Sequence, residues 1–172
     1  MIYPTSTDII ECIAANLDDK VAPHVQDAGA LSALATIRPM LRLVGARIRH
    51  EGAALLREIR QTRGLLTEAA QVIGGLPDEP WISLRADMAD YCGPPPWGED
   101  DYPDLIWLGK VAGRGNEIVQ ILLQALCRAG RVAPLPPDLQ KLREAIRKHL
   151  IDQLETETQL IVPTFSGIGP RR

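Results

Sequence analysis

The chain has 172 residues, of which 45% are apolar and 24% charged, a balance that argues against intrinsic disorder and fits one folded domain. Its net charge of -3 provides no field that would draw the protein to nucleic acid or to an anionic membrane surface. Only 4% of the residues are aromatic, and Leu, Ala, Ile, Arg and Glu dominate, so we expect an all-α fold.

The first helix is expected to follow Thr5, whose side chain can cap it, with Asp8 completing a capping box three residues later. Pro23 is expected to end this helix. Between these limits the apolar side chains recur at helical spacing: Ile9, Ile10, Ile13, Leu17 and Val21.

A long helix is predicted within residues 34–73, where apolar side chains step by threes and fours and only Glu51 and Thr62 interrupt the series. Such a series is typical of a helix in a bundle with knobs-into-holes packing. Two interpretations stay open, a continuous helix or two nearly collinear helices divided near Pro39 or Gly52. The series comprises Leu34, Ile37, Leu41, Val44, Ile48, Leu55, Ile59, Leu66, Ala69 and Ile73.

Three more helices are expected. One runs from about residue 81 to Gly93 and carries Trp81, Leu84 and Met88. The next spans 105–130, with a bend or break at Gly113–Gly115, and the last begins after Pro136, capped by Asp138. The sequence thus predicts a single domain, 1–172, built as a helical bundle of about five helices around one long central helix. Residues 74–104 are expected to form a loop-rich insertion and 163–172 a flexible tail.

The long helix carries the strongest charge pattern outside the core. Between residues 38 and 63 there are seven arginines and two glutamates, a net charge of 7 - 2 = +5 in an acidic protein. Five of the arginines fall within roughly 60° of one another at 100° per residue. They form either an anion- or partner-binding stripe or a plain solvated face, partly neutralised by acids on neighbouring helices or in residues 99–104. These five are Arg38, Arg42, Arg49, Arg60 and Arg63.

A second candidate contact surface is the Pro-rich, acidic segment 93–103, which cannot form regular structure. Aromatic side chains flanked by charge on a stiff turn suit a protein interface, and a surface loop folded back on its own core is the alternative. The proposed partner-docking loop comprises Trp97, Glu99, Asp100, Asp101 and Tyr102.

Paired carboxylates one helical turn apart, Asp8 with Glu11 and Asp87 with Asp90, have the spacing that holds Mg²⁺ in some bundle enzymes, but charged helix faces produce the same spacing. The histidines have no ExxH partner, so no metal site and no cofactor are expected.

The cysteines Cys12, Cys92 and Cys127 are odd in number and form no CxxC pair, which predicts reduced, buried thiols. With no signal-peptide pattern and no run of roughly 18 apolar residues, the chain is expected to be cytoplasmic and to have no membrane contact.

Two stretches resemble a family of small uncharacterised helical proteins. They are residues 4–23, which begin Pro-Thr-Ser-Thr-Asp, and residues 126–154, which contain Leu-Cys-Arg-Ala-Gly and then Pro-Asp-Leu. Members of that family are encoded beside kinases of the aminoglycoside-phosphotransferase type and acyl-CoA dehydrogenases. The resemblance implies a non-catalytic accessory subunit of such a kinase. It covers about a third of the chain, and residues 74–110 look like additional material.

Our leading hypothesis is therefore a non-catalytic helical interaction protein, an accessory or regulatory subunit of a cytoplasmic kinase-type enzyme that acts on acyl-CoA or similar small molecules. One alternative is a small helical enzyme that acts on a phosphorylated or CoA-linked substrate, using Asp87, Asp90 and the arginines. A second alternative is a self-contained homo-oligomer, with a homodimer formed along the apolar series of the long helix.

Overall fold

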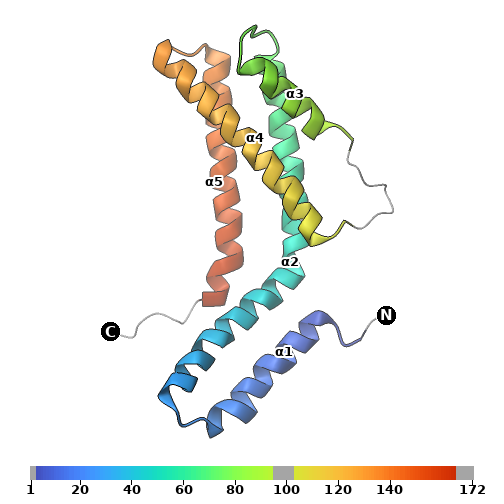
Figure 1. The fold of residues 1–172 in the computed structure, drawn as a ribbon, viewed down its shortest axis with the longest axis vertical. Coiled ribbons are helices and arrows are strands. Elements are labelled where there is room, and N and C mark those ends of the chain that lie inside the picture. The colour runs from blue at the N-terminus through green and yellow to red at the C-terminus, as the bar shows by residue number, and fades with distance from the viewer. Residues whose placement is uncertain (1–2, 95–102, 166–172) are drawn as a thin grey trace. The chain divides into compact units, whose positions relative to one another are not determined.

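The computed structural model describes residues 3–94 and 103–165 of the chain. Within these ranges the fold is an all-α bundle of five helices with no strand, as the sequence predicts (Figure 1). The chain divides into two compact units, Met1–Gly52 with Glu155–Arg172, and Ala53–Leu154, which we describe in turn.

The first unit begins with α1 (Ser6–Asn16), whose start has the expected capping box. The Thr5 hydroxyl accepts the Asp8 N–H at 3.2 Å, and the Asp8 carboxylate accepts the Thr5 N–H at 2.8 Å. The Thr5 hydroxyl and amide both donate to this carboxylate, which lowers the pKa of Asp8 from its ordinary value. A π-helical turn (Leu17–Val21) and a 3₁₀ turn (Ala22–His24) continue the helix as far as Pro23 and one residue beyond.

The long helix α2 (Ala28–Ile73) is continuous, so the interpretation with two collinear helices is wrong. It begins earlier than the apolar series because the Asp27 carboxylate accepts the Ala30 N–H at 2.7 Å and caps the first turn. Pro39 lies inside the helix and is buried. A proline at this position removes one backbone hydrogen bond, and in a helix of 46 residues the flanking turns and the packing of the ring offset that loss.

The second unit packs the last part of α2 with α3 (Trp81–Cys92), α4 (Leu105–Val132) and the first part of α5 (Pro137–Phe165). The expected burial of Trp81, Leu84 and Met88 is confirmed. Removing these apolar side chains from water is the main favourable contribution to folding. The most fully buried apolar residues of this unit are Leu66, Ala69, Ile73, Leu84, Met88, Ile118, Val119, Leu122, Leu126 and Ile146.

The predicted break in α4 at Gly113–Gly115 is wrong, because the helix runs through it. Gly115 is buried where α4 crosses α3, and a Cβ atom placed there would lie 2.4 Å from the Tyr91 hydroxyl oxygen and 2.9 Å from Thr62 Cγ2. The glycine therefore serves close helix packing, not a turn. Gly113 has open space around it.

The start of α5 also differs from expectation. Asp138 lies in the first turn, where the helix dipole favours an acid, and Pro137 occupies the first helical position, for which its fixed φ is suited. The helix continues past Pro163 to Phe165. The rest of the expected flexible tail, 166–172, lies outside the described residues.

All three cysteines are free thiols, but the expectation that they are buried is wrong. Cys92 and Cys127 are half-buried, and Cys92 packs against the apolar core. Cys12 is exposed because it belongs to α1, a helix in which no residue is buried.

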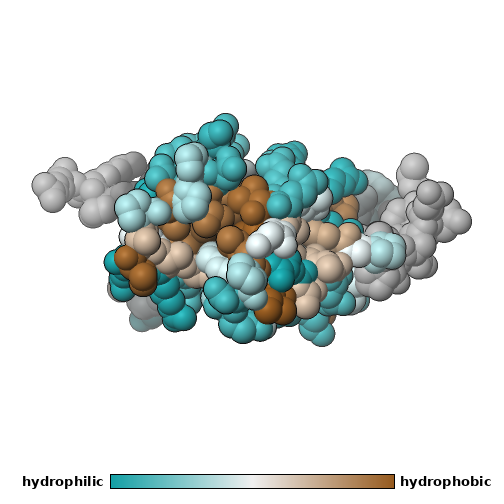
Figure 2. Space-filling model, turned by 90° about the horizontal axis from the view of Figure 1, so that it is seen from above, coloured by the Kyte–Doolittle hydropathy of each residue, from teal (hydrophilic) through white to brown (hydrophobic). Residues whose placement is uncertain are grey.

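Figure 2 looks onto the end of the molecule where α2 and α4 finish and α3 begins, and shows apolar side chains in the middle of this surface with hydrophilic ones around them. Val72, Ile82 and Val132 are exposed apolar residues at these helix ends. In the described part of the chain, no helix is both long enough and apolar enough to cross a bilayer.

The packing at Gly115 yields a paired prediction. Gly115→Ala should destabilise the fold by about 1–3 kcal/mol, because the new methyl group must displace the Tyr91 ring and Thr62. Gly113→Ala, two residues away with no neighbour within 4 Å, should stabilise it by up to about 1 kcal/mol through helix propensity. Urea-induced unfolding followed by circular dichroism checks both; equal effects of the two substitutions would contradict the tight contact.

Candidate functional site

The first unit contains a groove of about 230 Å³ between α1 and α2. Apolar and small side chains form its floor, and charged side chains stand along its rim. The lining residues are Ile10, Glu11, Ala14, Leu41, Arg42, Gly45, Ala46, Arg49 and His50.

The groove exists because small residues meet where the two helices pack. Gly45 is buried, and a Cβ atom at this position would lie 3.6 Å from Ile10 Cγ2, so the α2 backbone directly contacts the apolar side of α1. Ala14 and Ala46 keep the neighbouring positions shallow. The lining of the groove therefore combines the small residues Ala14, Gly45 and Ala46 with the apolar side chains of Ile10 and Leu41.

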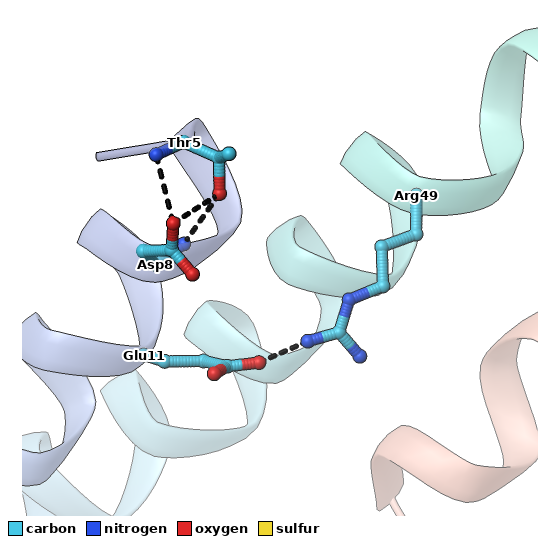
Figure 3. A network of polar contacts seen from close by, with 4 residues as sticks. All are labelled: Thr5, Asp8, Glu11 and Arg49. Carbon is cyan, nitrogen blue, oxygen red and sulfur yellow. Dashed lines mark hydrogen bonds and ion pairs between the residues drawn. The ribbon is translucent and has the colours of Figure 1, made fainter. Parts of the chain in front are cut away.

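Ion pairs between the helices hold one side of this hairpin together. Arg49 pairs with Glu11, and Figure 3 shows the two side chains reaching across from α2 and α1 beside the capping box at Thr5 and Asp8. Arg38 pairs with Asp18 further along. These side chains are roughly half-exposed, so each pair contributes at most about 1 kcal/mol to stability and mainly orients the helices.

The five arginines of the predicted stripe have different surroundings. Arg38 pairs with Asp18 and Arg49 with Glu11. Arg42, on the groove rim, is exposed and forms no ion pair within the described residues. Arg60 and Arg63 belong to the second unit. Arg60 is exposed, and the Arg63 guanidinium lies 5.6 Å from the centre of the Tyr91 ring, a cation–π geometry. Arg42 and Arg49 are thus the stripe residues that line the groove.

The other sequence candidates are not brought into a common site by the described residues. The docking loop of Trp97, Glu99, Asp100, Asp101 and Tyr102 lies outside them. Asp87 is bound by Arg114 at 2.7 Å, and Asp90 is exposed. No group of three or more His, Cys, Asp or Glu side chains suited to a metal ion occurs in the described ranges.

A second cleft, of about 330 Å³, lies in the second unit and contains neither Asp87 nor Asp90. Its one charged lining residue, Arg85, donates to the carbonyl oxygens of Ile73 at 3.0 Å and Leu76 at 2.7 Å. Arg85 therefore satisfies backbone acceptors at the end of α2. The remaining lining residues are Thr67, Ala70, Gln71, Met88, Ala89 and Cys92, a set with no acid–base pair.

Sequence reasoning missed a polar layer inside the second unit. The Glu58 carboxylate on α2 accepts hydrogen bonds from the side-chain amides of Asn116 on α4, at 2.8 Å, and Gln153 on α5, at 3.2 Å. One turn along, Thr62 Oγ1 lies 3.3 Å from His149 Nε2, and both residues are buried. The signal in the sequence was Thr62, a polar residue within the apolar series, but its partners come from other helices.

Burial shifts two pKa values in and beside this layer. Desolvation lowers the pKa of His149, while the carboxylates of Glu58 and Asp152 act in the opposite direction. Desolvation raises the pKa of Tyr91 to about 12, and its hydroxyl has no hydrogen-bond partner among the described residues. Both groups are therefore held in their neutral forms at neutral pH, as a packed helix interface requires.

Comparison with known proteins adds no relative to this geometry: no protein-family model, curated protein or solved structure matches the chain significantly.

The burial of His149 predicts a pH dependence of stability. Its folded-state pKa lies below the ordinary value of 6.5, so proton binding favours the unfolded chain. The stabilising contribution is fully present above pH 6.5 and is lost as the pH falls from there towards the folded-state pKa. Urea midpoints measured at several values between about pH 8 and 5 should fall with acidification in the wild type, and much less in His149→Gln. His50→Gln, at an exposed position of α2, should retain the wild-type slope.

Proposed function

We propose that this chain is a non-catalytic helical interaction protein, which binds a segment of a partner protein in the groove between α1 and α2. The proposal is based on the composition of the groove, in which an apolar floor around Ile10 and Leu41 lies beside the exposed side chain of Arg42. A partner segment with apolar side chains and a carboxylate would cover the floor and form a charge-assisted pair with Arg42.

The size of the groove favours a peptide segment over a small molecule. Sites for drug-sized ligands and cofactors commonly enclose about 300–1,000 Å³, whereas this groove has about 230 Å³. Its small-residue floor allows a partner backbone to approach closely, and a few anchoring side chains supply most of the affinity in such contacts.

The partner in this proposal is a cytoplasmic kinase of the aminoglycoside-phosphotransferase type that acts on acyl-CoA or a similar small molecule, with this chain as its accessory or regulatory subunit. Its support is the resemblance of residues 4–23 and 126–154 to small proteins encoded beside such kinases. The first of these stretches contains α1 and hence one wall of the groove.

A rival enzyme function would require acid–base groups around one cleft. The carboxylates considered for that function, Asp87 and Asp90, line neither described cleft, and Asp87 is bound by Arg114. The described geometry therefore favours the interaction protein.

The groove predicts a specific effect of Arg42→Gln. When the immobilised protein captures partners from native extract, the wild type should retain a kinase-type enzyme, and Arg42→Gln should retain it with at least roughly tenfold lower affinity, because a charge-assisted hydrogen bond is lost. Quantitative mass spectrometry at about 0.05 and 0.5 M salt measures both the partner and its charge dependence.

The matched control is Arg57→Gln, which removes the same charge from an exposed position of α2 outside the groove. It should bind like the wild type. Equal retention by Arg42→Gln and the wild type would remove the groove from the proposal. A chain that emerged without a partner and bound divalent metal stoichiometrically would favour the enzyme alternative.

A further inference from the structure

The α1–α2 hairpin of the first unit leaves much of its apolar surface exposed. No residue of α1 is buried. With the end of α5 belonging to the same unit, five β-branched side chains on α1 and α2 still expose 39–47% of their surface. We call this set the hairpin apolar face: Ile9, Ile13, Ile37, Val44 and Ile48.

These five residues lie on one side of the hairpin. On α2, taking Gly45 as the direction of α1, the residues Ile37, Val44 and Ile48 point roughly 60–100° to one side, and Arg38 and Arg49 point to the other.

On α1 the division is the same. With Ile10 as the direction of α2, Ile9 and Ile13 lie roughly 60–100° to one side, and Glu11 lies roughly 100° to the other. The pairs Arg49–Glu11 and Arg38–Asp18 place the two charged sides together. The two apolar sides must then share the opposite face of the hairpin.

We infer that the hairpin apolar face binds the same face of a second copy of this chain, so that two hairpins form a four-helix bundle. The hairpin consists of two antiparallel helices (Figure 1), which is half of a four-helix bundle. A second copy related by a two-fold axis provides the other two helices and an identical apolar face. This dimer uses the face opposite the ion pairs and is independent of the proposed partner groove.

Charge complementarity favours a second copy of the chain as the binding partner and determines its orientation. Residues 6–21 contain four acids and one lysine, a net charge of -4 + 1 = -3, whereas residues 28–52 contain four arginines and one glutamate, a net charge of 4 - 1 = +3. A two-fold axis parallel to the helices places each acidic α1 opposite the partner's basic α2. The perpendicular axis would place like-charged helices together, so the parallel axis is favoured.

A charged group is available at the rim of the face. Arg47 lies roughly 60° beyond Val44 on α2. It is exposed and has no ion-pair partner in the described part of the chain. In the dimer, Arg47 faces the acidic α1 of the second copy.

The test is the mass of the full chain in solution between about 1 and 100 μM, measured by sedimentation velocity and light scattering. The expected species is a dimer, twice the 18.9 kDa of one chain. The double substitution Ile37→Ser with Val44→Ser should convert it to a monomer, while Val132→Ser, at an apolar position of the second unit that is 89% exposed, should remain dimeric. A monomeric wild type at every concentration, or a dimer that survives the double substitution, overturns the inference.

A second variant decides the question if the double substitution unfolds the hairpin, as judged by circular dichroism. Arg47→Glu leaves the apolar residues untouched and should raise the dimer dissociation constant by about tenfold at low salt, because like charges then face each other. Arg57→Glu makes the same charge change in the second unit and should have no effect. An unchanged dissociation constant in Arg47→Glu overturns the charge-selected arrangement.

The proposed dimer and the proposed partner groove can be tested independently. Arg42→Gln, which tests the groove, should leave the dimer mass unchanged. If partner binding is absent but the dimer is intact, the proposed groove is wrong and the dimer stands. If the wild type is monomeric but still captures the kinase-type enzyme, the dimer is wrong and the groove stands.

Discussion

The fold depends on the burial of one face of α2 along its second half. There Leu66, Ala69 and Ile73 are fully enclosed by α3, α4 and α5, and this apolar contact supplies most of the free energy that orders the second unit. The same helix continues through the first unit with the same apolar rhythm, but there Ile37, Val44 and Ile48 remain 39–43% exposed. One uninterrupted helix thus has a covered half and a half whose apolar side chains remain in contact with solvent.

In the second unit, a few polar side chains determine the register of α2 relative to α4 and α5. Glu58 joins α2 to α4 and α5 through two amide donors, and Thr62 meets His149 one turn away. Such groups add little net stability compared with an apolar layer, but any shift of one helix along another would leave them buried and unpaired. The close contact between Gly115 and Tyr91 restricts the same interface by shape.

In the hairpin, ion pairs determine which sides of the two helical segments lie together. Two ion pairs hold the same side of α1 and α2, which leaves an apolar side opposite them and a shallow groove where Gly45 meets Ile10. Exposed ion pairs contribute little stability, so a hairpin of this kind gains substantially from contact with another molecule.

The sequence by itself determined the all-α class, the capping box at Thr5 and the core positions of α3, because these follow from helical periodicity and from bonds between residues three or four apart. It left open whether Pro39 divides α2, and it misassigned Gly115 as a break, because a glycine's role depends on what packs against it. Only the tertiary structure decided that Arg42 remains exposed while Arg49 is paired, and that Thr62 meets His149. Those outcomes depend on contacts between side chains far apart in the chain, and no local pattern specifies which helix faces meet.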